Sequence, residues 1–157
     1  MKEKMTIIFF SGTMDKAIAM LTLATTAAAM DMDVTVFFTF WGLSFLKKGK
    51  KYSKKGLFQK MLEFMIPKRM DALPLSSLNM LGMGPWMMEK LMKKTKSPGI
   101  EELFEMAKEL KVKFLACSTS CSVMGVDREN MIDEVQDIVG AASYIKEARE
   151  GKINLCI

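Results

Sequence analysis

The sequence predicts an α/β fold in which a parallel β-sheet lies between layers of helices. Short, continuous apolar runs recur along the 157 residues, and stretches with helical spacing separate them. The runs are nearly all apolar, as expected of strands that are buried on both faces of a parallel sheet. Strands that alternate with helices imply right-handed crossovers, which place helices on both faces. The length suits one domain, and 50% apolar with 26% charged residues is typical of a folded globular protein.

The N-terminal part of the chain supplies two strands and one helix. Residues 5–10 form an apolar, aromatic and β-branched run, and residues 11–15 end it with a polar turn. Residues 17–30 are rich in alanine, leucine and methionine, so we expect a helix there. This helix is apolar on nearly every side and should therefore be covered on all sides. Residues 34–40 form the second strand, whose continuous apolar character suits a central position.

A further helix and a third strand follow the middle of the chain. Ser97 and Pro98 are typical of a helix N-cap and first turn, and apolar residues with helical spacing continue to Leu110. Residues 113–117 form the third strand. The small residues of 118–126 then form a turn that leads into a helix.

The C-terminal residues complete the pattern. Asp127 is expected to cap another short helix, and residues 141–150 form the next one. Gly151 suits the C-terminal cap of that helix. Residues 153–157 form a terminal strand, so the residues alone indicate four strands, with no internal repeat and no domain boundary.

The middle of the chain differs in composition from both flanks. Residues 47–55 contain six lysines, and residues 61–92 carry eight of the 17 methionines. Prolines and glycines interrupt the methionine-rich span, which predicts two or three short helices joined by turns. We expect residues 47–96 to form a helical insertion within a single domain of residues 1–157.

The lysine run and the methionine-rich span each allow several interpretations. The lysines suit a solvated loop, or a surface that steers an acidic partner or makes peripheral contact with an anionic membrane. Only Tyr52 lies among them, and nucleic-acid surfaces interleave basic with aromatic residues, so we expect no nucleic-acid binding. The methionines suit a core with a subunit contact, or a docking surface for a protein or a membrane interface. They do not repeat at a fixed interval, which disfavours a soft-metal site.

The composition excludes several classes of site. Histidine is absent, so the chain alone can form no Ser-His-Asp triad, no Cys-His pair and no histidine-ligated metal site. Three cysteines are too few for a disulfide framework, which favours reduced thiols in the cytoplasm. No apolar stretch reaches the roughly 18–20 residues of a spanning helix, and a strand follows the N-terminus directly. We therefore expect no spanning helix, no secretory leader, no metal and no cofactor.

Cys117 is the leading candidate for a reactive residue. It ends a predicted strand just before a turn into a helix, at the sheet edge where open α/β folds bind ligands. The N–H groups and partial positive charge of a helix N-terminus favour a thiolate over a thiol. Small polar residues such as Ser118 and Ser120 leave room for a substrate. The alternative is a buried cysteine that serves as a small apolar residue.

The other two cysteines give weaker signals. Cys121 lies four residues after Cys117, so one helical turn would place both on the same side, with Cβ atoms roughly 5–6 Å apart. Cys121 is therefore either a candidate resolving thiol or an incidental small residue. Cys156 is expected to fill the core in the last strand.

A second candidate site follows the first strand. Gly12 allows a tight turn between Ser11 and Thr13, and the following helix presents free N–H groups that can hold an anion. The alternative is an ordinary strand-to-helix turn with Thr13 or Asp15 as the cap. In a parallel sheet this turn shares the carboxyl edge with Cys117, so the two could line one pocket.

Four segments carry a family resemblance that runs from residue 5 to residue 157. They are Phe10-Ser-Gly-Thr-Met-Asp-Lys16, Phe40-Trp-Gly-Leu43, Leu75-Ser-Ser-Leu-Asn-Met-Leu-Gly-Met-Gly84 and, most specifically, Ala116-Cys-Ser-Thr-Ser-Cys-Ser-Val-Met-Gly125. In these segments the chain resembles the DsrE/DsrF-like family of small sulfur-relay proteins, in its peroxiredoxin-like branch. The resemblance implies a three-layer, flavodoxin-like α/β fold with a five-stranded parallel sheet and helices on both faces.

The resemblance also implies a chemical role. Cys117 would hold sulfur as a persulfide and relay it to or from a TusA-like or rhodanese-like carrier protein, as a sulfurtransferase. Ser120 and Gly125 match the family's loop, and together with Ser118 they are candidate substrate- or anion-binding residues, as are those of the first turn. Cys121 does not match a carrier position, so a mechanism with two cysteines would be a departure from the family.

A non-catalytic scaffold or binding subunit of a sulfur-relay oligomer is the alternative. It would need an assembly and a docking surface, but no reactive thiol. The apolar helix of residues 17–30 and the methionine-rich surface exceed what a small monomer can cover. We therefore expect a homo-oligomer, a trimer or larger, in either case.

Overall fold

A parallel sheet forms the centre of the molecule. The computed structural model describes residues 2–49, 56–57, 61 and 66–157. Within these residues five strands pair in the order β4-β3-β2-β1-β5, and every pairing is parallel. The strands are β1 (Lys4–Phe9), β2 (Asp33–Phe38), β3 (Lys113–Cys117), β4 (Val135–Val139) and β5 (Gly151–Cys156). The expected five-stranded α/β fold is confirmed.

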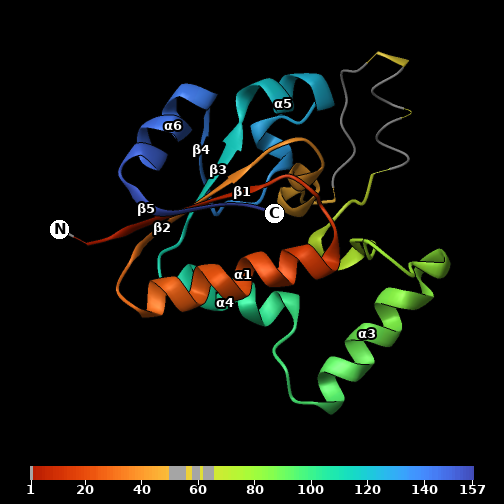
Figure 1. The fold of residues 1–157 in the computed structure, drawn as a ribbon. Coiled ribbons are helices and arrows are strands. Elements are labelled where there is room, and N and C mark those ends of the chain that lie inside the picture. Colours follow the sequence, from red (N-terminus) through yellow and green to blue (C-terminus); the bar gives the residue numbers. More distant parts are fainter. Residues whose placement is uncertain (1, 50–55, 58–60, 62–65) are drawn as a thin grey trace.

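Helices cover both faces of this sheet (Figure 1). α1 (Met14–Ala29) and α4 (Ile100–Glu109) pack side by side against one face, and α6 (Ala141–Arg149) lies on the other. α5 (Ser118–Met124) follows β3 at the carboxyl edge, and α3 (Met83–Lys94) lies apart from the sheet, beyond α1 and α4. Short 3-10 turns at Phe40–Leu46, Met70–Ala72, Met80–Gly82 and Arg128–Asn130 connect these elements.

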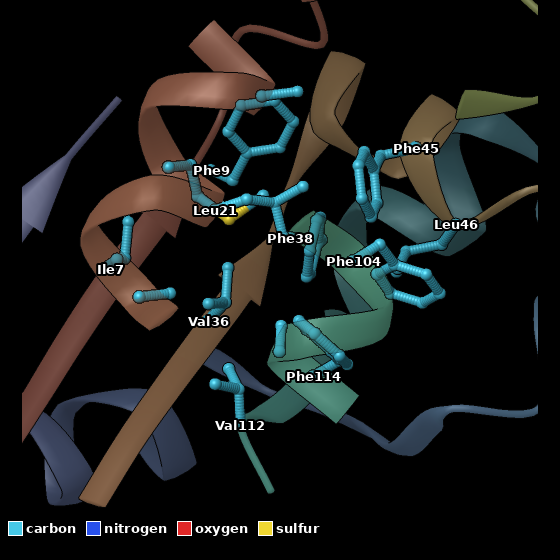
Figure 2. Close-up of a cluster of buried hydrophobic side chains, with 14 of the residues drawn as sticks. Ile7, Phe9, Leu21, Val36, Phe38, Phe45, Leu46, Phe104, Val112 and Phe114 are labelled. Carbon is cyan, nitrogen blue, oxygen red and sulfur yellow. The ribbon is translucent and has the colours of Figure 1, made fainter. Parts of the chain in front are cut away.

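The main core lies between the sheet and the α1–α4 layer (Figure 2). Aromatic rings are prominent in it because β1 and β2 each end in a phenylalanine, Phe9 and Phe38. The ring centroids of Phe9 and Phe38 are 5.7 Å apart, and those of Phe38 and Phe45 are 5.5 Å apart. Phe104 of α4 reaches Phe114 of β3 at 5.4 Å. This packing anchors β1, β2 and β3 and so positions their carboxyl ends relative to one another.

The opposite face has a smaller core under α6. Phe37 of β2 and Tyr144 of α6 stack with centroids 5.0 Å apart, and Cys117 completes this buried cluster. Tyr144 also lies within hydrogen-bonding distance of the Thr6 hydroxyl, at 3.2 Å. The side chain of Cys117 therefore belongs to the α6 face of the sheet.

Two boundaries differ from the prediction for physical reasons. α4 begins at Ile100 with Gly99 as its N-cap, and not at Ser97 and Pro98. Ser97 instead closes α3, because its N–H donates to the carbonyl of Met92 at 2.9 Å while Lys96 adopts a left-handed φ of 55°. The Glu102 carboxylate accepts the N–H of Gly99 and so completes the start of α4.

The C-terminal part differs from the prediction in one strand and in the position of one glycine. The sequence pattern did not predict β4. This strand lies at the edge of the sheet with Gln136 and Asp137 exposed, so it lacks a continuous apolar run. Asp127 does precede a short 3-10 turn, as expected, but its side chain makes no capping bond. Glu150 is the C-cap of α6, and Gly151 is the first residue of β5.

Within a single chain the first helix is covered on one side only, so the expectation that it is covered on all sides stays a prediction. α1 buries one side against the sheet and α4, while Ala19, Leu23 and Met30 are exposed on the other. The hydroxyls of Thr22 and Thr26 on this outer side donate to backbone carbonyls one turn earlier, at 2.8 and 2.7 Å. These threonines therefore satisfy their hydroxyl groups within the helix, and Leu23 and Met30 beside them are left uncovered by the single chain.

The middle of the chain contains α3 and two 3-10 turns among its described residues. The tyrosine and four of the lysines of the 47–55 run lie outside the described residues, and the extent of a 47–96 insertion stays a prediction. Lys47 forms an antiparallel bridge with Met131, which ties the start of this region to the chain after α5. Among the described residues, every helix is too short or too polar to cross a lipid bilayer.

Candidate functional site

The candidate site lies where β3 ends. Cys117 is the last residue of β3 and the N-cap of α5, with extended backbone angles of φ −74° and ψ 118°. Its register partner is Val139, the last residue of β4, so the two strands end side by side. Gly140 follows at once, and a Cβ on it would lie 3.9 Å from the hydroxyl of Ser118. The two loops therefore approach closely beside the cysteine.

The chain leaves these two neighbouring strands toward opposite faces of the sheet. After β3, the residues of α5 and its following loop enter the main core on the α1–α4 side, with Met124, Val126 and Met131 buried there. After β4, α6 crosses to the other face. A point at which the connections of adjacent strands diverge is where open α/β sheets place their ligands. Cys117 occupies such a point.

Four groups surround the sulfur of Cys117. Burial raises the pKa of this thiol, because only 7% of the residue is exposed. The hydroxyl and backbone N–H of Ser120, the N–H of Thr119 and the hydroxyl of Thr39 act in the opposite direction and stabilise the thiolate. Their combined effect prevails, so the pKa of Cys117 lies below its ordinary value. These four groups therefore favour the thiolate form of Cys117.

Thr39 is a site residue that the sequence analysis missed. It follows β2 directly, and its hydroxyl lies 2.8 Å from the hydroxyl of Ser120. Ser120 is itself almost fully buried, and Thr39 is half-buried, so this contact is partly buried. Only the neighbouring positions of β2 and β3 in the sheet bring Thr39 to the cysteine, since 81 residues separate it from Ser120. The signal in the sequence was a polar residue, Thr39, near the end of the apolar run of residues 34–40.

The structure separates the two neighbouring cysteines. Cys121 is buried in the main core, whereas Cys117 belongs to the cluster under α6. Burial raises the pKa of Cys121 to about 12, and the charges of Cys117 and Asp127 act in the same direction. Both cysteines are free thiols. The resolving role of Cys121 stays a prediction, and it would require a thiol that remains protonated at neutral pH.

The remaining residues of the α5 segment divide into two groups. Ser118 and Ser120 lie beside Cys117, in the first turn of α5. Gly125 ends α5 in a left-handed conformation with φ 63°, which suits glycine. A helix of this length extends roughly 10 Å. Gly125 therefore lies at the far end of α5 from the cysteine, and a substrate-binding role for it stays a prediction.

The turn of Ser11, Gly12 and Thr13 lies at the same edge but not beside Cys117. β2 separates β1 from β3, so two strand spacings, roughly 10 Å, lie between the turn and the cysteine. Gly12 has a left-handed φ of 61°, and a Cβ there would lie 2.2 Å from the carbonyl oxygen of Trp41. The absence of a side chain at Gly12 thus allows its backbone to lie close to the backbone of Trp41.

Groups of the chain itself occupy the start of α1. The N–H of Met14 donates to the carbonyl of Pro74 at 2.8 Å, and the Asp15 carboxylate accepts the N–H of Ser76 at 2.9 Å. Burial raises the pKa of Asp15, but its hydrogen bonds with Ser76 outweigh this effect and lower it. An anion at residues 11–13 would have to bind beside these contacts, and this site stays a prediction.

An aromatic rim lies on the carboxyl ends of β1 and β2. Phe10, Phe40 and Trp41 are each more than two-fifths exposed, and the rings of Phe10 and Phe40 lie 5.5 Å apart. Exposed large aromatic side chains at one edge are typical of protein contact sites. Sequence reasoning noticed these residues only as part of a resemblance.

The position of Cys156 corrects a further expectation. It was predicted to fill the core, but the structure exposes it. The reason is topological, because β5 is an edge strand and most of its side chains are exposed. Among the described residues, histidine, cysteine, aspartate and glutamate form no cluster of three that could hold a metal ion.

The sequence of the whole chain matches a known family. The model of the DsrE/DsrF/DrsH-like family matches residues 1–156, and the chain belongs to that family. It is 40% identical over 156 residues to the uncharacterized protein YrkE of Bacillus subtilis (strain 168), covering 99% of this chain and 97% of the relative. It is 36% identical over 160 residues to the sulfur carrier protein DsrE2 of Allochromatium vinosum, covering 99% of both.

Solved structures share the fold at low sequence identity. The ychN protein of E. coli superposes with a TM-score of 0.60 at 12% identity, covering 99% of both chains. The protein MTH1491 of Methanobacterium thermoautotrophicum gives 0.53 at 11% identity, covering 99% of this chain and 100% of the other. At these identities the likeness concerns the fold alone.

Proposed function

We propose that the protein is a sulfur carrier that holds sulfur as a persulfide on Cys117 and relays it to or from a partner carrier protein. The observation that carries the proposal is the set of donors around the Cys117 sulfur, namely the N–H groups of Thr119 and Ser120 and the hydroxyls of Ser120 and Thr39. Membership of the family and the 36% identity to a protein named as a sulfur carrier support it.

The proposed transfer needs a thiolate and no histidine base. The Cys117 thiolate attacks the outer sulfur of a donor persulfide, a new S–S bond forms, and the donor's own S–S bond breaks. The donor departs as a thiolate, and Cys117 is left as a persulfide, so sulfur moves without any added oxidant or reductant. In the second half an acceptor thiolate attacks the outer sulfur, and Cys117 leaves as a thiolate.

The surroundings of Cys117 suit both halves of this exchange. Hydrogen bonds that stabilise the thiolate increase the share of the attacking form at a given pH. They also make Cys117 a better leaving group when the acceptor attacks. The bound persulfide places its outer sulfur about 2 Å beyond Sγ, which lessens the effect of the low exposure of the cysteine.

The partner would be a TusA-like or rhodanese-like protein that presents its own cysteine. The aromatic rim of Phe10, Phe40 and Trp41 lies on the same edge as Cys117 and would form the contact. We also propose that the chain assembles into a homo-oligomer, because the outer side of α1 leaves Leu23 and Met30 uncovered. Three reduced thiols fit the cytoplasm as its location.

The low exposure of Cys117 favours a second candidate function. With 7% of its surface accessible, the cysteine could serve as a packing residue in a non-catalytic scaffold subunit. Alkylation kinetics separate the two functions. A carrier thiolate reacts with iodoacetamide faster than an ordinary exposed thiol, whereas a packed thiol reacts only after unfolding.

Persulfide loading tests the main proposal directly. The full chain carrying Cys156→Ser, which removes the exposed thiol, is incubated with glutathione persulfide and measured by intact-protein mass spectrometry. We expect a gain of about 32 Da that peptide mapping assigns to Cys117. The same protein with Cys117→Ser should gain nothing, and with Cys121→Ser it should still load. Equal loading after Cys117→Ser contradicts the proposal.

A further inference from the structure

The outward side of α3 and the turn before it carry apolar side chains into solvent. Met83, Met87 and Leu91 follow one another at intervals of four residues, so they form one stripe, and each is more than half exposed. Leu81, in the turn before the helix, is fully exposed. In a surface helix the apolar stripe ordinarily faces the core, whereas the stripe of α3 faces solvent.

Lysines flank this stripe. Lys90, Lys93 and Lys94 lie on α3, and all three are exposed. Within the described part of the chain none of the three forms an ion pair. The ammonium of Lys90 lies 5.0 Å from the ring centre of Trp86, which is also largely exposed. The outward surface is thus apolar along its centre and basic along its edge.

The contacts of Gly84 hold the start of α3 in this orientation. Gly84 is buried, and a Cβ on it would lie 2.1 Å from the carbonyl oxygen of Leu78. Leu78, Met80 and Leu81 adopt left-handed φ values of 57°, 41° and 56°, which are costly for residues with large side chains. A strained turn that holds leucine and methionine in water indicates a surface that is covered in use.

We propose that the α3 surface, formed by Leu81, Met83, Trp86, Met87 and Leu91 with Lys90, Lys93 and Lys94, docks on an anionic lipid bilayer. α3 would lie in the plane of the interface, with its apolar stripe among the acyl chains and its lysines among the headgroups. Tryptophan prefers this depth because its ring is apolar and its N–H is polar.

Charge and shape favour a bilayer over a second copy of the chain. The sequence carries a formal charge of +5, and two copies that met at this surface would bring their lysines together. The surface is one helix that stands apart from the sheet (Figure 1), and a single helix suits a flat interface. The proposal does not depend on the chemistry of Cys117.

Vesicle co-sedimentation tests the proposal with the full chain. One set of vesicles is phosphatidylcholine alone, and the other contains about 30% phosphatidylglycerol, which supplies negative charge. We expect at least tenfold more binding to the anionic vesicles at low salt, with most of it lost at about 0.5 M salt. The fluorescence of Trp86, assigned by comparison with Trp86→Phe, should shift to the blue on binding.

Two matched variants separate the surface from general charge. Lys90→Gln/Lys93→Gln/Lys94→Gln should lower anionic binding at least tenfold, whereas Lys111→Gln/Lys113→Gln/Lys146→Gln, with the same loss of charge elsewhere, should leave it within twofold. Met83→Ser/Met87→Ser/Leu91→Ser should abolish the Trp86 shift, and circular dichroism verifies that it folds. Cys117→Ser should bind vesicles like the wild type.

Three results would overturn the proposal. Equal binding to neutral and anionic vesicles contradicts it, and so does equal loss in the two lysine variants. If Met83→Ser/Met87→Ser/Leu91→Ser instead lowers the mass measured by light scattering, a second copy covers this surface. Failure of persulfide loading would leave the lipid proposal intact, so the two proposals fail separately.

Discussion

The hydroxyl of Thr39 lies 2.8 Å from the hydroxyl of Ser120, and both groups stabilise the thiolate of Cys117. This contact joins the end of β2 to the first turn of α5. A residue with no nucleophilic role of its own thus contributes to the reactivity of the cysteine. The contact also makes the reactivity of Cys117 sensitive to a residue outside its own loop.

Removal of the Thr39 hydroxyl should weaken the thiolate. We expect Thr39→Val to raise the pKa of Cys117 and to slow its alkylation at pH 7 roughly three- to tenfold, because one hydrogen bond of about 1 kcal/mol is lost. The thiolate absorbance near 240 nm, followed against pH, measures the change. Thr39→Ser keeps the hydroxyl and should restore the wild-type profile. An unchanged profile in Thr39→Val would show that Thr39 only fills space.

The pKa values of Cys117 and Cys121 should be shifted in opposite directions. Hydrogen bonds lower the pKa of Cys117, so its thiolate should persist at lower pH than that of an ordinary thiol, whereas Cys121 should stay protonated until about pH 12. In pH-dependent alkylation, peptide mapping should show Cys117 modified first and Cys121 last. Modification of Cys121 ahead of Cys117 at neutral pH would contradict the burial of Cys121.

Cys121 should also destabilise the fold in alkali. The pKa of Cys121 is higher in the folded chain than in the unfolded chain. Its contribution to the free energy of unfolding is therefore complete below about pH 8.5 and declines as pH rises toward 12. The difference in free energy of unfolding between the wild type and Cys121→Ala should therefore narrow above about pH 9. Cys156→Ala, which removes an exposed thiol, is the matched control for the loss of one cysteine.

Gly12 should be intolerant of any side chain. We expect Gly12→Ala to lower the free energy of unfolding by roughly 2–4 kcal/mol, because its Cβ meets the carbonyl of Trp41 and its φ is left-handed. Urea denaturation measures the loss. Gly99 is the matched control, since it caps α4 with open space around it, and Gly99→Ala should cost about 1 kcal/mol or less. Similar losses at both positions would contradict the close approach.

The central aromatic cluster should contribute most of the stability per residue. Phe38 is fully buried and contacts Phe9, Phe45 and Phe114 (Figure 2), so Phe38→Ala should cost about 3–5 kcal/mol. Phe10→Ala, at the exposed aromatic rim, should cost less than about 1.5 kcal/mol. Comparable losses would contradict the assignment of Phe10 to a contact surface.

Local patterns in the sequence determined the fold class and the leading candidate residue. Nearly continuous apolar runs mark β1, β2 and β3, because strands that are buried on both faces carry few polar side chains in their interior. β4 was missed because an edge strand is free of that constraint and keeps Gln136 and Asp137 in water. The position of Cys117 at the end of β3 follows from the run that precedes it.

Only the tertiary structure decided what surrounds that cysteine. Thr39 reaches it because β2 and β3 are neighbours, and strand order is not encoded in the local sequence around either residue. The spacing of Cys117 and Cys121 suggested that both lie on the same side of one helix. Cys117 is instead the last residue of β3, and Cys121 lies in α5, so their side chains are buried in different clusters. Cys156 is exposed for a similar reason, since burial depends on which strand forms the edge of the sheet.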